Sequence, residues 1–425
     1  MKLHLKNIAK IKNADIIIDG ITVIGGENDT GKSTVGKALF AVYHSFFNIE
    51  ERIKEERIES LANWLGRIYI NTKVRMVRRI ESKVLADDIL KHVEEIRQES
   101  PESCQLLTDL IHKYDEELVQ YLDSDILKNV NKNVKTVLNI TDDEFFLNVI
   151  ENNLASEFNG QICNIYNKKE GEIDLEIEKQ HMKICVNYHH LTHITPPNLP
   201  IRADIAYIED PFILDDYRLM YLDYSIGSIL HQTQLRKKLF LENGSNNHFD
   251  IIADQEKLAV INGLIANACS GNIFFDKQRY AYLRKEGGGP LDVHNLSAGL
   301  KTFAILKMLL QNGRLERNGV LILDEPEIHL HPQWQLLFAE IIVLLQREFD
   351  LHILLNTHSP YFLRAIQVYA AKYNRADLCR YYMSQLEGDL ANIVDVTDCV
   401  DKVYAKLAKP FQQLEDERVE NGKLE

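Results

Sequence analysis

The segment Gly26-Glu-Asn-Asp-Thr-Gly31-Lys32-Ser33 is the strongest indication of the fold, because it fits the pattern GxxxxGK[ST]. An apolar run, Ile21-Thr-Val-Ile24, precedes it, and apolar residues recur at helical spacing from Ser33 to about Phe47. The predicted order is therefore strand, glycine loop, helix, which is the context that this motif requires. A glycine turn followed by a chance Lys-Ser is the competing interpretation, and the flanking elements argue against it.

The residue types of this loop suit a nucleoside triphosphate with magnesium. Glycines let backbone N–H groups close around phosphates, and the N-terminus of the following helix favours negative charge. Lys32 is expected to reach the β- and γ-phosphates, and the Ser33 hydroxyl to ligate Mg²⁺. The residues predicted to bind the nucleotide are Gly26, Asn28, Asp29, Gly31, Lys32, Ser33 and Thr34.

A second apolar run, Val320 to Leu323, ends in the carboxylate pair Asp324-Glu325. Both acids would emerge at the carboxyl end of a strand, where open α/β sheets bind ligands. Taken alone, the pair is a plain loop start, but the upstream glycine loop favours a Walker B motif. Asp324 is then expected in the Mg²⁺ shell, and Glu325 is expected to orient or deprotonate the attacking water.

Two further motifs decide which class of nucleotide-binding head this is. Leu296-Ser297-Ala298-Gly299-Leu300-Lys301 opens a predicted helix before Asp324, and His358 follows an apolar strand after it. Alone, Ser297 could be a simple helix N-cap beside a close-packed glycine, and His358 a hydrogen-bonded loop histidine. The order of glycine loop, Ser-x-Gly helix, Asp-Glu strand and strand-end histidine is much harder to produce by chance.

This set resembles the ABC-type ATPase heads of the SMC and RecF class, and most closely the bacterial OLD-like AAA family ATPases, over residues 1–47 and 203–373. The resemblance implies ATP and Mg²⁺ as cofactors and Mg²⁺-dependent hydrolysis, with Glu325 and His358 as catalytic residues. It implies a head-to-head dimer or higher oligomer, in which Ser297 and Gly299 contact the nucleotide of the other head. His329 and His331 would lie in the D-loop.

The chain also departs from the family pattern. Ala298 and Leu300 stand where the sequence LSGGQ has Gly and Gln, and the candidate for the Q-loop is the region of Glu209. OLD proteins carry a C-terminal nuclease domain of the Toprim type. The acids that follow His358 here do not form the spaced Glu and DxD set that two-metal chemistry needs, so we expect no nuclease in this chain.

The alternation of apolar strands and helices predicts an α/β fold, namely a P-loop NTPase head of ABC type with an antiparallel β lobe and helical insertions. Residues 171–188 alternate in polarity and predict a β-hairpin of that lobe. No sustained heptad run is present, so the long insertion is expected to be compact rather than an extended coiled coil. The predicted head comprises residues 1–48, 159–213 and 269–425, with helical insertions at 49–158 and 214–268.

A basic cluster lies within the long insertion, formed by Lys73, Arg75, Arg78 and Arg79. These side chains could contact phosphate or an acidic partner. The alternative is a solvated helix face that nearby acids balance.

Composition limits the remaining classes. The 425 residues, 45% of them hydrophobic, predict a globular protein, and no apolar run approaches the length that spans a bilayer. No signal peptide is evident, so a cytoplasmic location without membrane contact is expected. The six cysteines form no CxxC pair, which argues against zinc sites and disulfides. The net charge of −14 does not indicate a nucleic-acid partner, although it does not exclude a local basic patch.

Three functions remain open from the sequence. The leading hypothesis is an ATP-gated dimeric switch that controls a separate effector protein, with the resemblance suggesting bacterial anti-phage defence. The alternative is a DNA-repair or chromosome-associated clamp whose heads bind DNA directly. The third is a nucleotide-bound scaffold that hardly turns over.

Overall fold

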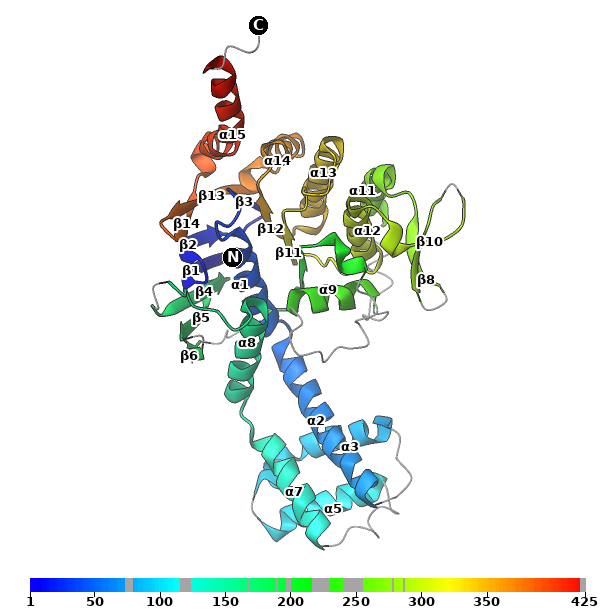
Figure 1. Cartoon of the computed structure of the whole chain (residues 1–425). Helices are drawn as coiled ribbons and strands as arrows, with labels where there is room; N and C mark the ends of the chain where they lie inside the picture. Colours follow the sequence, from blue (N-terminus) through cyan, green and yellow to red (C-terminus); the bar gives the residue numbers. More distant parts are fainter. Residues whose placement is uncertain are drawn as a thin grey trace. The chain divides into compact units, whose positions relative to one another are not determined.

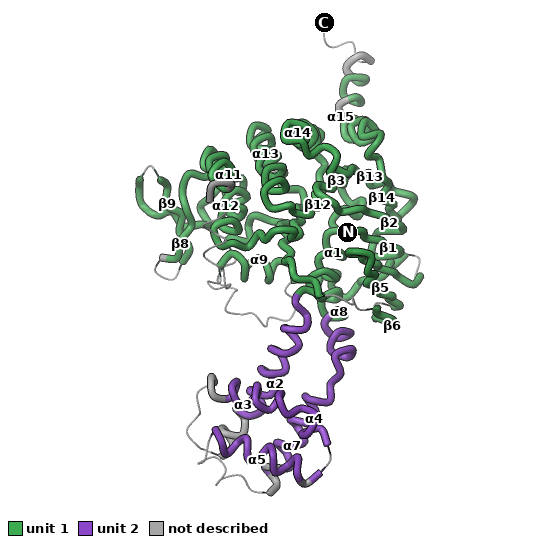
Figure 2. The backbone as a smooth tube through the Cα atoms, turned by 180° about the vertical axis from the view of Figure 1, so that it is seen from behind, with its two compact units in different colours: residues 1–47, 150–425 green, residues 48–149 purple. Residues whose placement is uncertain are grey.

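A computed structural model describes residues 1–72, 79–98, 100–114, 124–166, 169–188, 190–195, 200–215, 230–240, 255–276, 279–285 and 287–420. The chain divides into two compact units (Figure 2). The first unit contains Met1–Phe47 and Ile150–Glu425, and the second contains Asn48–Val149. No helix within the described ranges is both long enough and apolar enough to cross a membrane.

One large sheet organises the first unit. Within the described residues its strands follow the order β6-β5-β4-β1-β2-β14-β13-β3-β12-β11-β7. Their bounds are β1 Lys2–Ile8, β2 Ile11–Ile17, β3 Ile21–Gly25, β4 Gly171–Ile177, β5 Gln180–Asn187, β6 His190–Ile194, β7 Ile205–Ile208, β11 Val320–Asp324, β12 His352–Thr357, β13 Cys379–Glu387 and β14 Leu390–Asp395.

The sheet has a parallel half and an antiparallel half. Strands β13, β3, β12, β11 and β7 are mutually parallel, whereas β6, β5, β4, β1 and β2 pair antiparallel. All residues of β3, β7 and β11 are buried, as expected for parallel strands covered on both faces. The predicted α/β P-loop head with an antiparallel lobe is confirmed.

The turn between β2 and β3 does not close a hairpin. These strands are consecutive in the chain, yet β14 and β13 lie between them in the sheet. Gly20 makes this crossing with φ 70°, and a Cβ added there would lie 2.5 Å from the Leu378 carbonyl oxygen. Glycine is therefore required both by the left-handed backbone and by the close approach of another segment.

Helices complete the first unit, and α13 and α14 lie side by side in it (Figure 1). A small separate sheet of order β10-β9-β8 comprises β8 Asn272–Asp276, β9 Arg279–Leu283 and β10 Leu291–Asp292. The helices are α1 Lys32–Phe46, the C-terminal part of α8 Asp142–Phe158, α9 Leu230–Phe240, α11 Gln255–Ala268, α12 Ala298–Gln311, α13 Pro332–Phe349, α14 Pro360–Lys372 and α15 Asp401–Glu420, with 3₁₀ turns at Pro211–Leu214, Val293–Asn295, Ala376–Leu378 and Thr397–Cys399.

The second unit is helical throughout its described residues. Its helices are α2 Ile49–Thr72, α3 Arg79–Lys91, α4 Val93–Arg97, α5 Pro101–Tyr114, α7 Ser124–Asn139 and the beginning of α8. They share one apolar core that includes Leu61, Ile89, Ile111 and Val134. Within the basic cluster, Lys73, Arg75 and Arg78 lie outside the described residues, as does the side chain of Arg79.

The two units do not coincide with the predicted insertions. The second unit ends at Val149, before the predicted boundary at 158, because α8 continues into the first unit. The described helices of 214–268, α9 and α11, belong to the first unit and bury Leu235, Leu239, Ile261 and Ile265 in its core. The domain boundaries derived from the sequence stay a prediction.

Candidate nucleotide-binding site

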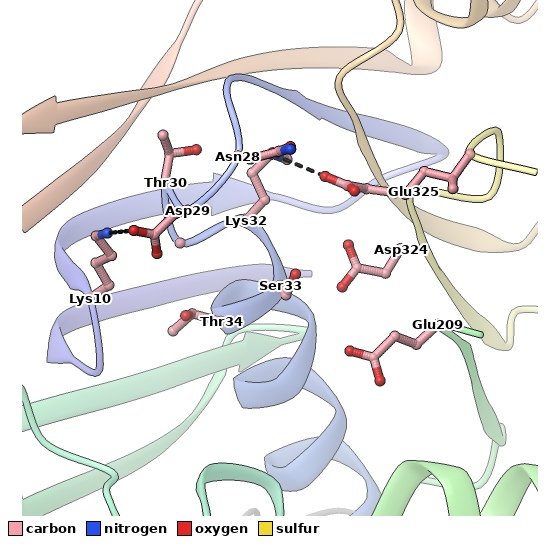
Figure 3. Close-up of a pocket in the computed structure, with 12 residues that line it drawn as sticks. Lys10, Asn28, Asp29, Thr30, Lys32, Ser33, Thr34, Glu209, Asp324 and Glu325 are labelled. Carbon is pink, nitrogen blue, oxygen red and sulfur yellow. Dashed lines mark hydrogen bonds and ion pairs between the residues drawn. The ribbon is translucent and has the colours of Figure 1, made fainter.

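The glycine loop leaves the buried strand β3 and enters α1 at the carboxyl edge of the parallel sheet (Figure 3). Gly31 precedes α1 with φ 80°, and Asp29 also has a positive φ of 59°. These left-handed positions turn the chain sharply, and no side-chain cap occupies the N-terminus of α1. The free N–H groups of the helix are thus available to an anion.

A cavity of about 410 Å³ opens above this loop. Its walls come from four segments of the chain: the β1–β2 turn, the glycine loop with α1, the end of β7 and the end of β11. The lining residues are Lys10, Asn28, Asp29, Thr30, Gly31, Lys32, Ser33, Thr34, Glu209, Asp324, Glu325 and Ile328.

The Lys32 ammonium is held over the loop, and its side chain is 4% exposed. Its Nζ donates to the carbonyl oxygens of Glu27 at 2.7 Å and Gly26 at 3.2 Å. It also lies 3.1 Å from Glu325 Oε1. A buried ammonium with these partners is a strong attractor for a polyphosphate.

Asp324 is buried at the end of β11, 4% exposed, and faces Ser33 (Figure 3). Its carboxylate accepts hydrogen bonds from Asn356 Nδ2 at 3.0 Å and from the Tyr207 hydroxyl at 2.9 Å. Burial raises the pKa of Asp324, although hydrogen bonds from Ser33, Asn356 and Tyr207 oppose the rise. A carboxylate beside a hydroxyl suits Mg²⁺, which binds through few protein oxygens when phosphates complete its shell.

Glu325 stands between two basic groups. Its Oε1 faces Lys32, and its Oε2 lies 3.4 Å from His358 Nδ1. The contact with His358 and then the charge of Lys32 lower the pKa of Glu325, despite its burial. The same contact raises the pKa of His358. Glu325 is therefore an ionised carboxylate at the cavity, as a water-activating group requires.

A buried acid that the sequence did not single out fixes His358. Glu327 is 1% exposed, and its Oε1 accepts hydrogen bonds from the Thr357 hydroxyl and, at 3.1 Å, from the His358 backbone N–H. This acid comes just after the Asp-Glu pair, whereas its partners are Thr357, the last residue of β12, and His358, which follows it. No motif or spacing indicates that these two segments meet.

Two further residues line the cavity that the sequence motifs did not assign to it. Lys10, from the β1–β2 turn, forms an ion pair with Asp29 and lines the cavity, but no local motif marks it. Glu209, the candidate Q-loop residue, also lines the cavity, beyond the end of β7. A hydrogen bond with His231, which outweighs burial, lowers the pKa of Glu209 to about 2, so this third carboxylate is ionised.

The signature-like motif has a different environment. Ser297 caps α12 by accepting a hydrogen bond from the Leu300 N–H at 3.4 Å. Gly299 packs against the D-loop segment, where an added Cβ would lie 2.9 Å from the His329 carbonyl oxygen. Neither residue belongs to the described lining of the cavity. The N-cap interpretation is thus correct for the isolated chain, and Ser297 remains exposed.

The two D-loop candidates also lie away from the cavity lining. His331 caps α13, with its Nδ1 accepting from the Gln333 N–H at 3.4 Å. The ring of His329 meets Phe212 edge-on at 5.7 Å. The structure thus brings together the predicted Walker A residues, Asp324, Glu325 and His358, but not Ser297, Gly299, His329 or His331.

Comparison with known proteins finds one family model that matches part of the chain. Residues 142–364 match the family described as "AAA domain, putative AbiEii toxin, Type IV TA system", a segment that contains the Ser-x-Gly helix, the Asp-Glu strand end and His358. The "Retron Vc95 probable ATPase" of Vibrio cholerae serotype O1 biovar El Tor is 32% identical over 92 residues. That match covers 19% of this chain and only 17% of the relative.

Solved structures of SMC heads also align with the chain. The SMC head domain from Thermotoga maritima has 13% identity and a TM-score of 0.38, covering 93% of this chain and 98% of that one. An SMC head bound to the C-winged helix domain of ScpA has 11% identity and a TM-score of 0.42, covering 93% and 96%. Because the family match above spans more than half of the 425 residues, the protein belongs to this AAA-domain family.

Proposed function

We propose that this ATPase is a dimeric switch, closed by ATP and opened by hydrolysis, which controls a separate effector protein in bacterial defence. The observation that carries the proposal is that one cavity is lined by Lys32, Ser33, Asp324 and Glu325. His358 lies directly behind this lining, 3.4 Å from Glu325. The family description and the partial match to a retron ATPase support the defence role.

Each of these residues has a definite task in hydrolysis. Lys32 and the N-terminus of α1 bind the triphosphate, and Ser33 with Asp324 would hold Mg²⁺, which neutralises phosphate charge when bound. Phosphate competes with Glu325 for Lys32 and releases the Glu325 carboxylate to orient the attacking water. His358 lies next to Glu325 and is assigned the contact with the γ-phosphate in this proposal.

A second copy of the chain would complete the site. Ser297 is exposed at the N-terminus of the 14-residue helix α12, where a hydroxyl and the helix dipole favour an anion. It does not line the cavity of its own chain. A two-fold dimer would bring Ser297 of each copy to the nucleotide of the other, giving two composite sites.

The test uses Glu325→Gln, which should bind ATP but turn it over roughly 100-fold more slowly because the general base is lost. Light scattering with MgATP should show this variant as a dimer. Adding Lys32→Ala should return it to the oligomeric state seen without nucleotide, because phosphate binding is lost while the fold remains. If ATP leaves the Glu325→Gln variant unchanged in mass, the switch is wrong.

The effector is tested separately, by co-expressing the chain with the products of neighbouring genes. A partner that co-purifies with wild type, and changes its retention between Glu325→Gln and Lys32→Ala, supports the proposal. Strong stimulation of hydrolysis by DNA alone, lost steeply with salt, would instead favour the clamp.

A further inference from the structure

A buried imidazole lies between two carboxylates beside the nucleotide cavity. His231, on α9, is 1% exposed, and its Nδ1 lies 2.8 Å from Glu157 Oε2 on α8. Its Nε2 lies 3.0 Å from Glu209 Oε2. The second oxygen of Glu157 accepts the backbone N–H of His231 at 2.7 Å. One acid therefore fixes the start of α9 and its ring, and the other faces the cavity.

Packing leaves this ring little freedom to rotate. The Tyr207 ring stacks on His231 with centroids 4.2 Å apart and planes 24° apart, and Phe40 meets it edge-on at 6.1 Å. The Tyr207 hydroxyl in turn donates to Asp324. Thus His231 touches the site at two points, directly through Glu209 and through Tyr207 to the residue at the magnesium position.

Hydrogen-bond chemistry defines what His231 does. An imidazolium has two N–H donors at a fixed angle, so it can hold two carboxylates at once. Charge-assisted bonds of this kind keep buried acids ionised and oriented, whereas removing one partner leaves an uncompensated charge. Glu157, His231 and Glu209 form a hydrogen-bonded triad. Glu157 is fully buried, whereas the Glu209 side chain is 29% exposed at the cavity and is the member that can change its position.

We propose that His231, anchored by Glu157, is a positioning residue that holds the Glu209 carboxylate toward the magnesium end of the cavity. There Glu209 would accept hydrogen bonds from the water molecules that a bound Mg²⁺ retains. This inference rests on the proposed ATPase function. It adds a second, indirect layer of residues to the predicted set of Ser33 and Asp324.

Two substitutions of His231 separate this role from general packing. In His231→Gln the amide nitrogen can take the place of Nε2 and keep the bond to Glu209. In His231→Asn it can take the place of Nδ1 and keep only the bond to Glu157. We expect turnover at saturating MgATP to fall about tenfold or more in His231→Asn, and to stay at least fivefold higher in His231→Gln, since holding Glu209 is the function.

Binding measurements give a readout other than activity. The Mg²⁺ concentration that half-saturates ATP binding should rise several-fold in His231→Asn, while ATP affinity in EDTA stays at the wild-type value. The matched control is His190→Asn, because His190 lies 3.0 Å from Glu151 on the same helix α8 but outside the cavity lining. It should change neither quantity.

Glu209→Ala tests the same inference while leaving the buried pair of His231 and Glu157 unchanged. It should reproduce the Mg²⁺ effect of His231→Asn, and His231→Asn should add little in the Glu209→Ala background. If Glu209→Ala has wild-type turnover and Mg²⁺ dependence, or if His231→Asn and His231→Gln are equally impaired, the inference is wrong. Absence of hydrolysis in the wild-type protein would instead refute the proposed function.

Discussion

Glu327 has a structural environment that its position next to the Asp-Glu pair does not indicate. It follows the Asp-Glu pair by one proline, yet it is buried and binds the Thr357 hydroxyl and the His358 backbone rather than a ligand. Its second oxygen has no hydrogen-bond partner in the described structure. It therefore braces the loop that carries His358, at the cost of burying a carboxylate.

This burial predicts a pH dependence of stability. Desolvation raises the pKa of Glu327, against the bonds from Thr357 and His358. An acid whose folded pKa is raised weakens the native state as the pH rises from its unfolded pKa, about 4.3, through the folded pKa. The amide of Glu327→Gln does not titrate, so the variant escapes this loss of stability. The melting temperature of Glu327→Gln minus that of wild type should therefore increase between pH 5 and pH 8.

Glu340→Gln is the control of opposite sign. Bonds from Lys372 and Tyr373 outweigh burial and lower the pKa of Glu340, so that it stabilises the protein above its unfolded pKa and loses this effect only in acid. The melting temperature of Glu340→Gln should lie below that of wild type by a constant amount between pH 5 and pH 8. A pH-independent difference for Glu327→Gln would contradict the assignment of a raised pKa.

At the scale of elements, the crossing from β2 to β3 places the glycine loop at the centre of the sheet. The chain leaves β2 and enters β3 only after passing the segment that leads into β13, and Gly20 makes that passage. The loop after β3 can then meet the ends of both β11 and β12, which carry Asp324 and His358.

Gly20→Ala should therefore destabilise the protein more than a turn glycine alone would predict. Gly388, between β13 and β14, is the matched control, because its φ of 65° resembles the 70° of Gly20 but an added Cβ would meet nothing within 4 Å. Gly388→Ala should cost about 1–2 kcal/mol through backbone strain. Urea unfolding should show a clearly larger loss for Gly20→Ala, and equal losses would exclude the steric role of Leu378.

For the whole molecule, the proposed switch predicts that two copies share each site. Ser297 lies outside the cavity lining of its own chain, so the proposal assigns its contact with the γ-phosphate to the partner. Ser297→Arg and Lys32→Ala should each abolish hydrolysis alone. A forced heterodimer of the two variants retains one intact composite site and should recover part of the activity.

The comparison that decides the matter is a wild-type chain paired with the double variant. If this pair hydrolyses ATP while the heterodimer of single variants does not, Ser297 acts within one chain and the sandwich dimer is wrong. Single-turnover measurements on both pairs, at equal occupancy by ATP, give the ratio of their hydrolysis rates directly.

The class of fold and the contiguous part of the site could be predicted from the amino-acid sequence. The glycine loop, the Asp-Glu strand end and the histidine after β12 are recognisable because each is set by a short segment in which a buried strand gives way to a turn. The hairpin of β4 and β5 was also predicted, since its alternation and turn are local.

The strand order and the residues that support the site could not be predicted in this way and became visible in the three-dimensional structure. Lys10 meets Asp29, Glu327 meets Thr357, and His231 joins Glu157 to Glu209 across 74 and 22 positions of the chain. Such contacts produce no periodicity or motif in the sequence, because burial and charge pairing require only that the two side chains be close in space. Sequence spacing constrains the backbone of one segment, whereas packing of the whole sheet selects which segments become neighbours.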